Sequence, residues 1–236
     1  MIYEIMHFTK KVLYRLGALL RKRDLGMIPK SYIKRFLPKN PVVVDAGAHI
    51  GRDTIEMARM WPSGTIHAFE PIPQLYSQLE LNTASTKNIT CYPMALSDRL
   101  GSFPIHVSSG FDDGSSSLLA PREHLTVHPQ VEFLETIHVP TTTLDSWAKD
   151  NDISRVDFLW LDLQGHELSV LKASPKVLRT VIAIHTEVSL KTMYEGSALY
   201  PELRSWLEQK GFEVKREALP WSDMGNVFFV GSSTKL

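Results

Sequence analysis

The chain has 236 residues, of which 43% are hydrophobic and 22% are charged, and its formal net charge is zero. These values are ordinary for a globular protein with one large domain. No run approaches the roughly 18 apolar residues of a membrane span, and the first residues lack the apolar core of a secretion signal. The single cysteine, Cys91, excludes an intramolecular disulfide, so we expect a cytoplasmic protein.

The first 40 residues differ in charge from the rest of the chain. They hold ten Lys and Arg residues against two acidic residues, whereas residues 41–236 carry a net charge of −8. Apolar residues at three- and four-residue spacing predict a basic amphipathic helix over 3–22, and 31–37 reads as a second short helix. We interpret residues 1–40 as a helical extension. Its apolar face packs on the domain or on a second subunit, or it lies peripherally on the inner face of an anionic membrane.

From residue 41 onward, strand and helix patterns alternate. Apolar runs predict strands over 42–45, 65–69, 89–92, 103–107, 156–163 and 181–186, and a terminal pair over 212–216 and 227–230. Helices are predicted over 52–60, 72–82, 144–149, 201–210, and 167–178 with an interruption near Pro175. Residues 108–136 are expected to be irregular, with a short strand over 136–140. The alternation indicates an α/β domain over 41–236, in which a mostly parallel sheet carries helices on both faces.

The first predicted strand ends in a glycine turn, Asp45-Ala46-Gly47-Ala48-His49-Ile50-Gly51. Gly47 allows the backbone to approach a ligand, and Gly51 allows close packing of helix and strand. A dinucleotide places its pyrophosphate at such a turn, where the carboxylate of Asp45 would repel it. The turn also lacks the G-x-G-x-x-G glycine order. A cationic ligand without phosphate suits it better, and S-adenosylmethionine is such a ligand.

Acidic residues recur where the predicted strands end. In a parallel sheet these positions share one edge, where ligands bind, so a set of carboxylates there favours a cation. Glu70 lies 19 residues after Gly51, a distance at which an acid can accept both ribose hydroxyls; otherwise it caps the helix that follows. Asp98 accepts from an adenine amino group or belongs to a turn. The five strand-end acids are Asp45, Glu70, Asp98, Asp162 and Glu187.

These motifs together resemble the FkbM family of S-adenosylmethionine-dependent methyltransferases. The resemblance runs from about residue 41 to residue 230 and is carried by Val44–Gly51, Phe69-Glu70-Pro71, Ala95–Asp98, Gly114–Leu118 and Asp162–Glu167. It implies a class I methyltransferase fold, with a seven-stranded sheet whose last strand is reversed, and methyl transfer mostly to hydroxyl oxygen. The family usually has Asn at the position of His49 and Glu at the position of Gln164. The resemblance and the turn together assign eight residues to the cofactor site: Asp45, Gly47, Gly51, Glu70, Asp98, Ser116, Ser117 and Asp162.

Methyl transfer to a hydroxyl requires a group that takes its proton. Asp162, His166, Glu167 and Glu187 are the candidates. His166 and Glu167 also suit a helix start, where a His is often solvated and an acid interacts favourably with the dipole. Glu187 follows an apolar strand and has no structural reason to be acidic. Asp162, His166 and Glu187 can also collect a divalent ion, but their spacing matches no established metal motif, so a metal is not favoured.

The favoured function is therefore S-adenosylmethionine-dependent O-methylation of a hydroxyl on a glycan or a secondary metabolite. An NAD(P)-dependent oxidoreductase is the alternative on the same architecture, and Asp45 argues against it. A catalytically inactive, membrane-associated cofactor-binding module is a further alternative, which Gln164 keeps open. Nucleic-acid binding is not expected, because the basic residues are confined to the first 40 positions. The oligomeric state stays open.

Overall fold

A seven-stranded sheet forms the centre of the computed structural model, which describes residues 26–232. The helix predicted over 3–22, with its membrane contact, lies outside the described residues. The strand order is β3-β2-β1-β7-β8-β10-β9, and every neighbouring pair is parallel except those that involve β10. This order confirms the predicted mostly parallel sheet with a reversed last strand. The strands are β1 (Val42–Ala46), β2 (Thr65–Phe69), β3 (Ile89–Tyr92), β7 (Phe158–Leu161), β8 (Ala183–Ser189), β9 (Phe212–Ala218) and β10 (Met224–Gly231).

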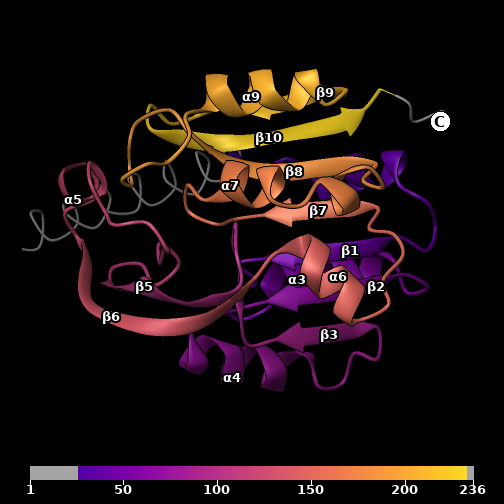
Figure 1. Ribbon diagram of the computed structural model, residues 1–236, viewed down its shortest axis with the longest axis horizontal. Coiled ribbons are helices and arrows are strands. Elements are labelled where there is room, and N and C mark those ends of the chain that lie inside the picture. The colour runs from indigo at the N-terminus through magenta and orange to yellow at the C-terminus, as the bar shows by residue number, and fades with distance from the viewer. Residues whose placement is uncertain (1–25, 233–236) are drawn as a thin grey trace, which may run out of the picture.

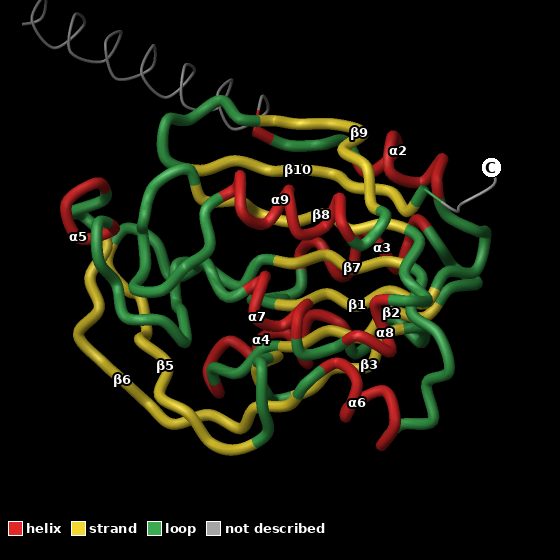
Figure 2. The backbone as a smooth tube through the Cα atoms, turned by 45° about the horizontal axis from the view of Figure 1, so that its top comes forward, coloured by secondary structure: helices red, strands yellow, loops and turns green. Residues whose placement is uncertain are grey.

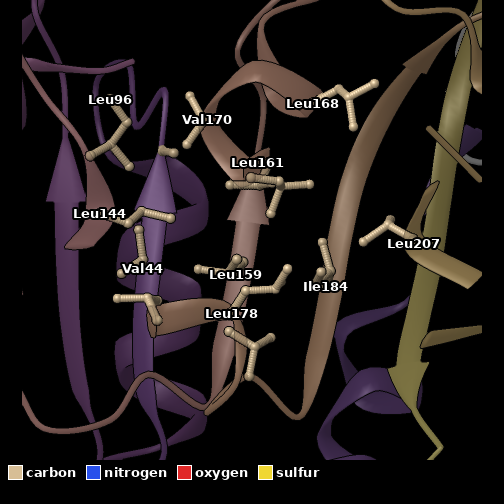
Figure 3. Close-up of a cluster of buried hydrophobic side chains, with 14 of the residues drawn as sticks. Val44, Leu96, Leu144, Leu159, Leu161, Leu168, Val170, Leu178, Ile184 and Leu207 are labelled. Carbon is tan, nitrogen blue, oxygen red and sulfur yellow. The ribbon is translucent and has the colours of Figure 1, made fainter. Parts of the chain in front are cut away.

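Helices cover both faces of this sheet (Figure 1). One face carries α2 (Lys30–Ile33), α3 (Arg52–Met60) and α4 (Pro73–Thr83). The other face carries α6 (Leu144–Asp150), α7 (Glu167–Lys172), α8 (Pro175–Leu178) and α9 (Tyr200–Gln209). Alternate strand residues supply the two faces, so Val43 packs on the α3 side and Val44 on the α6 side. Figure 3 shows the larger cluster, in which Val44, Leu159 and Ile184 from the strands meet helix residues such as Leu168.

The short helical segment before β1 belongs to the core. Ile28 and Ile33 are buried against the α3 side of the sheet, and Phe36 of the 3-10 turn η1 (Lys34–Phe36) packs edge-on against Phe228. This burial places the residues from Ile28 to Phe36 within the folded domain, although the sequence divides the chain at residue 40.

A second, three-stranded sheet projects from the domain. It has the order β4-β6-β5, formed by β4 (Ala95–Leu96), β5 (Gly101–Gly110) and β6 (Val131–Thr142). The antiparallel ribbon of β5 and β6 extends toward α5 (His124–Val127), as Figure 2 shows. The prediction of irregular structure over 108–136 is therefore wrong at both ends. The alternation of buried and exposed residues in β6 is interrupted by three consecutive exposed residues at 134–136, so the sequence predicts only its second part, over 136–140.

The register of the main sheet brings the predicted site residues to one edge. Ala46 pairs with Phe69 on one side and with Leu161 on the other, so Gly47, Glu70 and Asp162 leave the sheet together. Leu161 in turn pairs with Thr186, which places Glu187 one residue further along the same edge. The strand order reverses between β1 and β7, and ligands of open α/β sheets bind at such a switch point.

Candidate active site

A cavity of about 370 Å³ opens at this edge, between the ends of β1, β2 and β7 and the loop over residues 112–118. We call it the first cavity. Six carboxylates line it, against one arginine, Arg52. They are Asp45, Asp53, Glu70, Asp112, Asp113 and Asp162. A cavity with this lining favours a cationic ligand.

Asp45 ends β1 and is almost completely buried. Its Oδ2 accepts a hydrogen bond of 2.5 Å from the Thr54 hydroxyl at the start of α3. Burial raises the pKa of Asp45 to about 7, and the nearby carboxylates of Asp53 and Asp162 add to the shift. A cation in the first cavity would stabilise the ionised form of this group.

Three successive backbone donors of the glycine turn, those of Gly47, Ala48 and His49, are already engaged. The N–H groups of Gly47 and Ala48 both donate to the carbonyl of Phe69, at 3.1 and 2.9 Å, and the N–H of His49 donates to Glu70 Oε2 at 2.9 Å. A pyrophosphate needs such donors free. The turn therefore does not have the anion-binding character of a dinucleotide site.

Glu70 holds both ends of its own turn. Besides His49, it accepts at Oε1 from the N–H of Ile72 at 2.9 Å, just before α4. Burial raises its pKa to about 7 despite these two bonds. Glu70 thus fixes the turn before α4 without capping the helix, whose N-cap is Ile72, and each carboxylate oxygen keeps a further lone pair.

Gly51 and Asp98 do not line this cavity. A Cβ on Gly51 would lie 2.6 Å from Leu79 Cδ1, so this glycine serves the close packing of α3 on α4. Asp98 follows β4 of the second sheet instead of a strand of the main sheet, and it contacts Arg99 Nε at 3.4 Å and the Ser97 hydroxyl at 3.2 Å. Asp98 thus follows a different sheet from the one that the sequence assigned to it, although Ala95 and Leu96 of β4 line the first cavity.

Ser116 and Ser117 line the first cavity on the loop over 112–118. The Ser116 hydroxyl accepts from the N–H of Ser108 at 2.9 Å, and the Ser117 hydroxyl donates to the carbonyl of Gln164 at 2.9 Å. On the far side of the loop, Asp113 Oδ1 lies 3.1 Å from His49 Nε2. The loop is therefore tied to the glycine turn and to the turn after β7.

A second cavity of about 480 Å³ adjoins the first, and Asp112, Gly114 and Asp162 line both. Its other polar lining comes mainly from α5, from the turn after β7, from β8 and from the loops beside them, and among residues 26–232 no Lys or Arg lines it. The residues used below are His124, His128, Gln164, Glu167, Glu187, Tyr194 and Met224. Two adjoining cavities suit a cofactor and an acceptor that react at their junction.

Asp162 and Glu187 form an acidic pair at this junction. The Gln164 side-chain amide donates from Nε2 to Asp162 Oδ1 at 2.7 Å and to Glu187 Oε2 at 3.0 Å. Burial and the charge of Asp162 raise the pKa of Glu187 well above its ordinary value, and burial also raises the pKa of Asp162. A carboxyl whose pKa moves toward neutrality is a better proton acceptor at physiological pH.

His166 and Glu167 occupy different environments. His166 lines the first cavity, its Nε2 lies 3.1 Å from the Ser97 hydroxyl, and burial lowers its pKa. Glu167 is buried and accepts from the N–H groups of Leu163 and Gly165, at 2.9 and 3.3 Å. Both backbone bonds of Glu167 hold the turn after β7, which fits the helix-start interpretation.

The acceptor side contains two histidines, His124 and His128, that the sequence did not single out. His128 Nε2 lies 2.8 Å from Asp223 Oδ2, and the ring of His124 lies 5.4 Å from that of Tyr194. Both histidines come from the segment expected to be irregular, so no periodic pattern marked them. Trp221 lines a third cavity beside β10, together with Met224.

The strand order and the paired cavities at its switch point are those of a class I methyltransferase. The model of the Methyltransferase FkbM domain matches residues 45–214, and the chain belongs to this family. The 2-O-methyltransferase NoeI of Sinorhizobium fredii is 30% identical over 162 residues, covering 66% of this chain and 67% of the relative. Methyltransferase sdnD of Sordaria araneosa is 27% identical over 214 residues, covering 79% of each chain.

Two solved structures share the fold. A methyltransferase FkbM from Methylobacillus flagellatus has a TM-score of 0.50 at 15% identity; the match covers 81% of this chain but only 44% of that one. Fibrillarin from Aeropyrum pernix, solved with natively bound S-adenosyl-L-methionine, has a TM-score of 0.50 at 16% identity and covers 92% of this chain and 74% of its own.

Two searches of the described part of the chain gave negative results. Between residues 26 and 232, no three His, Cys, Asp or Glu side chains are grouped as a metal site. Over the same residues, no helix has the length and apolar character to cross a bilayer.

Proposed function

We propose that this protein binds S-adenosylmethionine in the first cavity and methylates a hydroxyl oxygen of a neutral small molecule or glycan in the second. The observation that carries the proposal is the combination of six lining carboxylates with a glycine turn whose N–H groups at Gly47, Ala48 and His49 are already used. Such a site accommodates a cation and excludes a pyrophosphate. When bound, the cofactor supplies an electrophilic methyl group on a sulfonium.

The residues of the first cavity have distinct roles in this proposal. Glu70 holds the ribose hydroxyls through its free lone pairs, and Asp45 with Asp162 complements the positive charge. Gly47 keeps the turn close to β7, and Ser116 with Ser117 holds the loop that excludes water. Gly51 allows α3 to pack closely on α4 and does not contact the cofactor. The cofactor contact expected of Asp98 is not part of the proposal.

The acidic pair supplies the base. Asp162 lines both cavities and Glu187 the second, so a proton leaving an acceptor hydroxyl has a carboxylate oxygen within the same cavity. His166 faces the first cavity and Glu167 is engaged by two backbone N–H groups, so neither is as well placed. Within the part of the chain that the structure describes, no Lys or Arg lines the second cavity, which favours an acceptor without phosphate or carboxylate groups. The name of the relative NoeI, a 2-O-methyltransferase, agrees with transfer to oxygen.

Glu187→Gln tests the base. Because an amide of the same shape cannot take the proton, methyl transfer falls by about 10²- to 10⁴-fold while cofactor binding is retained. Transfer is measured with methyl-labelled S-adenosylmethionine and a panel of neutral oligosaccharides with their uronic-acid counterparts, and cofactor binding by calorimetry. Glu213→Gln, an exposed acid on β9, is the matched control. Undiminished transfer in Glu187→Gln, or label on the uronic acids alone, contradicts the proposal.

A further inference from the structure

Gln164 lies at the junction of the two cavities in a backbone conformation that is unusual for its residue type. Its φ is +50°, and the following Gly165 has a φ of +94°. The Ser117 hydroxyl fixes the Gln164 carbonyl, and a Cβ on Gly165 would lie 2.7 Å from that of Ser197. This turn directs the Gln164 amide toward Asp162 and Glu187 on one side and toward Tyr194 on the other.

The Tyr194 hydroxyl has two hydrogen-bond acceptors within reach but only one proton to donate. Its hydroxyl lies 2.6 Å from the carbonyl oxygen of Ser115 and 2.9 Å from Gln164 Oε1, and the side chain is 2% exposed. A phenol donates one hydrogen bond, whereas both partners are acceptors. Only one of the two contacts is therefore satisfied at a time in this arrangement.

A half-turn of the Gln164 amide gives a second complete arrangement. In the first, Tyr194 donates to Oε1 and Nε2 donates to two carboxylate oxygens, which carry no proton. In the second, Nε2 donates to the Tyr194 oxygen, Tyr194 donates to Ser115, and Oε1 faces both Asp162 Oδ1 and Glu187 Oε2, so it accepts from both carboxyls, each of which then carries a proton. The two carboxyls share a hydrogen bond, which requires one proton between them before the reaction, so one further proton completes the second arrangement.

We propose that Gln164 and Tyr194 are positioning residues that relay the arrival of a proton on the Asp162–Glu187 pair to the Ser115 carbonyl in the loop over 112–118. The inference rests on the proposed function, because that pair is its base. As the acceptor oxygen gains the methyl group, its O–H bond breaks and a carboxyl O–H bond forms on the pair. The amide then turns, and the Tyr194 O–H bond, which stays intact, redirects its hydrogen bond from Oε1 to the Ser115 carbonyl. The loop that lines both cavities is thereby held more tightly once the base has taken the proton.

A carboxylate in place of Gln164 cannot perform this relay. It has no N–H groups for the pair, and it would add a third negative charge beside Asp162 and Glu187. Other acids already surround the pair: Glu167 on α7, Asp112 on the loop and Asp53 on α3. Burial, followed by the charges of Glu187, Asp162 and Glu167, raises the pKa of Tyr194 far above its ordinary value, so Tyr194 keeps its own proton throughout.

Fluorine NMR tests the relay in the full chain, with 3-fluorotyrosine inserted at position 194 alone. The relay predicts that its signal shifts as the pair titrates, and that the shift is lost in Gln164→Met, which keeps both carboxyls but has no amide. The same label at Tyr200, whose hydroxyl donates to Glu217 away from the cavities, is the control and does not report the titration of the pair. In the unsubstituted chain, the ¹³C signal of the Ser115 carbonyl shifts with the same apparent pKa, so the test does not depend on the folding of a variant.

The outcomes separate the relay from the proposed function. A Tyr194 signal that does not titrate, or that titrates equally in Gln164→Met, overturns the relay, because a through-space effect of the carboxyl charges needs no amide. A Ser115 signal that stays constant while Tyr194 shifts also overturns it. The labelled-methyl assay on Glu187→Gln decides separately whether the pair is the base.

Discussion

Gly47 follows β1 and lies directly against Asp162, the residue that follows β7. A Cβ there would lie 2.0 Å from the Asp162 carbonyl oxygen, and its φ is +83°. Gly211 has a similar φ of +85° but open space around it. Gly211→Ala therefore costs about 1–2 kcal/mol of backbone strain, whereas Gly47→Ala costs more, because β1 and β7 must separate.

Urea unfolding of the two variants measures this difference. Equal losses of unfolding free energy would show that the contact between Gly47 and Asp162 contributes nothing beyond strain. Gly47→Ala also weakens cofactor binding, because Asp162 moves with the strand, whereas Gly211→Ala leaves binding unchanged.

Some residues of the site could be predicted from the sequence, and others could not. Asp45, Glu70, Asp162 and Glu187 were identified from their positions after strands, because a parallel register alone brings them together. The partners of Gln164 could not be predicted in this way. Its contact with Tyr194 spans 30 residues and depends on how two irregular turns close, for which the sequence has no periodic signal.

At the scale of elements, the segment from Ile28 to Phe36 stabilises the domain. Ile33 is completely buried among residues of α3 and the sheet. Ile33→Ala removes this packing and leaves a cavity, so the free energy of unfolding falls by about 2–5 kcal/mol. Denaturant unfolding measures the loss, with Leu81→Ala on exposed α4 surface as the control. A loss below 1 kcal/mol would show that the segment is separable, as a boundary at residue 40 implies.

The ribbon of β5 and β6 shows where element prediction fails. The main-sheet strands are buried apolar runs and were located to within a few residues, whereas the alternation in β6 is interrupted at 134–136, where three consecutive residues are exposed. Its pairing with β5 is set by cross-strand contacts along Gly101–Gly110, which short-range patterns do not record. The second cavity is built on this ribbon and α5, so its histidines were missed with it.

At the scale of the whole molecule, the buried acids make stability depend on pH. The pKa values of Asp45, Glu70 and Glu167 are raised to about 7 from ordinary values of 3.8 and 4.5. A carboxyl whose pKa is higher in the folded than in the unfolded state binds its proton more tightly when folded. Its contribution to stability is therefore fully present at a pH below the pKa of the unfolded state, and it is lost as the pH rises toward 7. The contribution of these groups to the melting temperature therefore falls between about pH 4 and pH 7 in the ligand-free protein. Asp45→Asn shows a smaller fall in calorimetric melts; an identical slope contradicts the assignment.

The central claim is that the carboxylate edge of the sheet binds a cationic cofactor, and calorimetric titration against pH tests it most directly. The ionised forms of Asp45 and Glu70 favour the cation, so affinity for S-adenosylmethionine rises with pH toward about 7, by up to about tenfold per unit for each carboxyl that must lose a proton. Glu70→Ala lowers the affinity by about tenfold or more, and NAD does not bind. Affinity for S-adenosylmethionine that is independent of pH and of Glu70, or tight binding of NAD in the same cavity, would contradict the account.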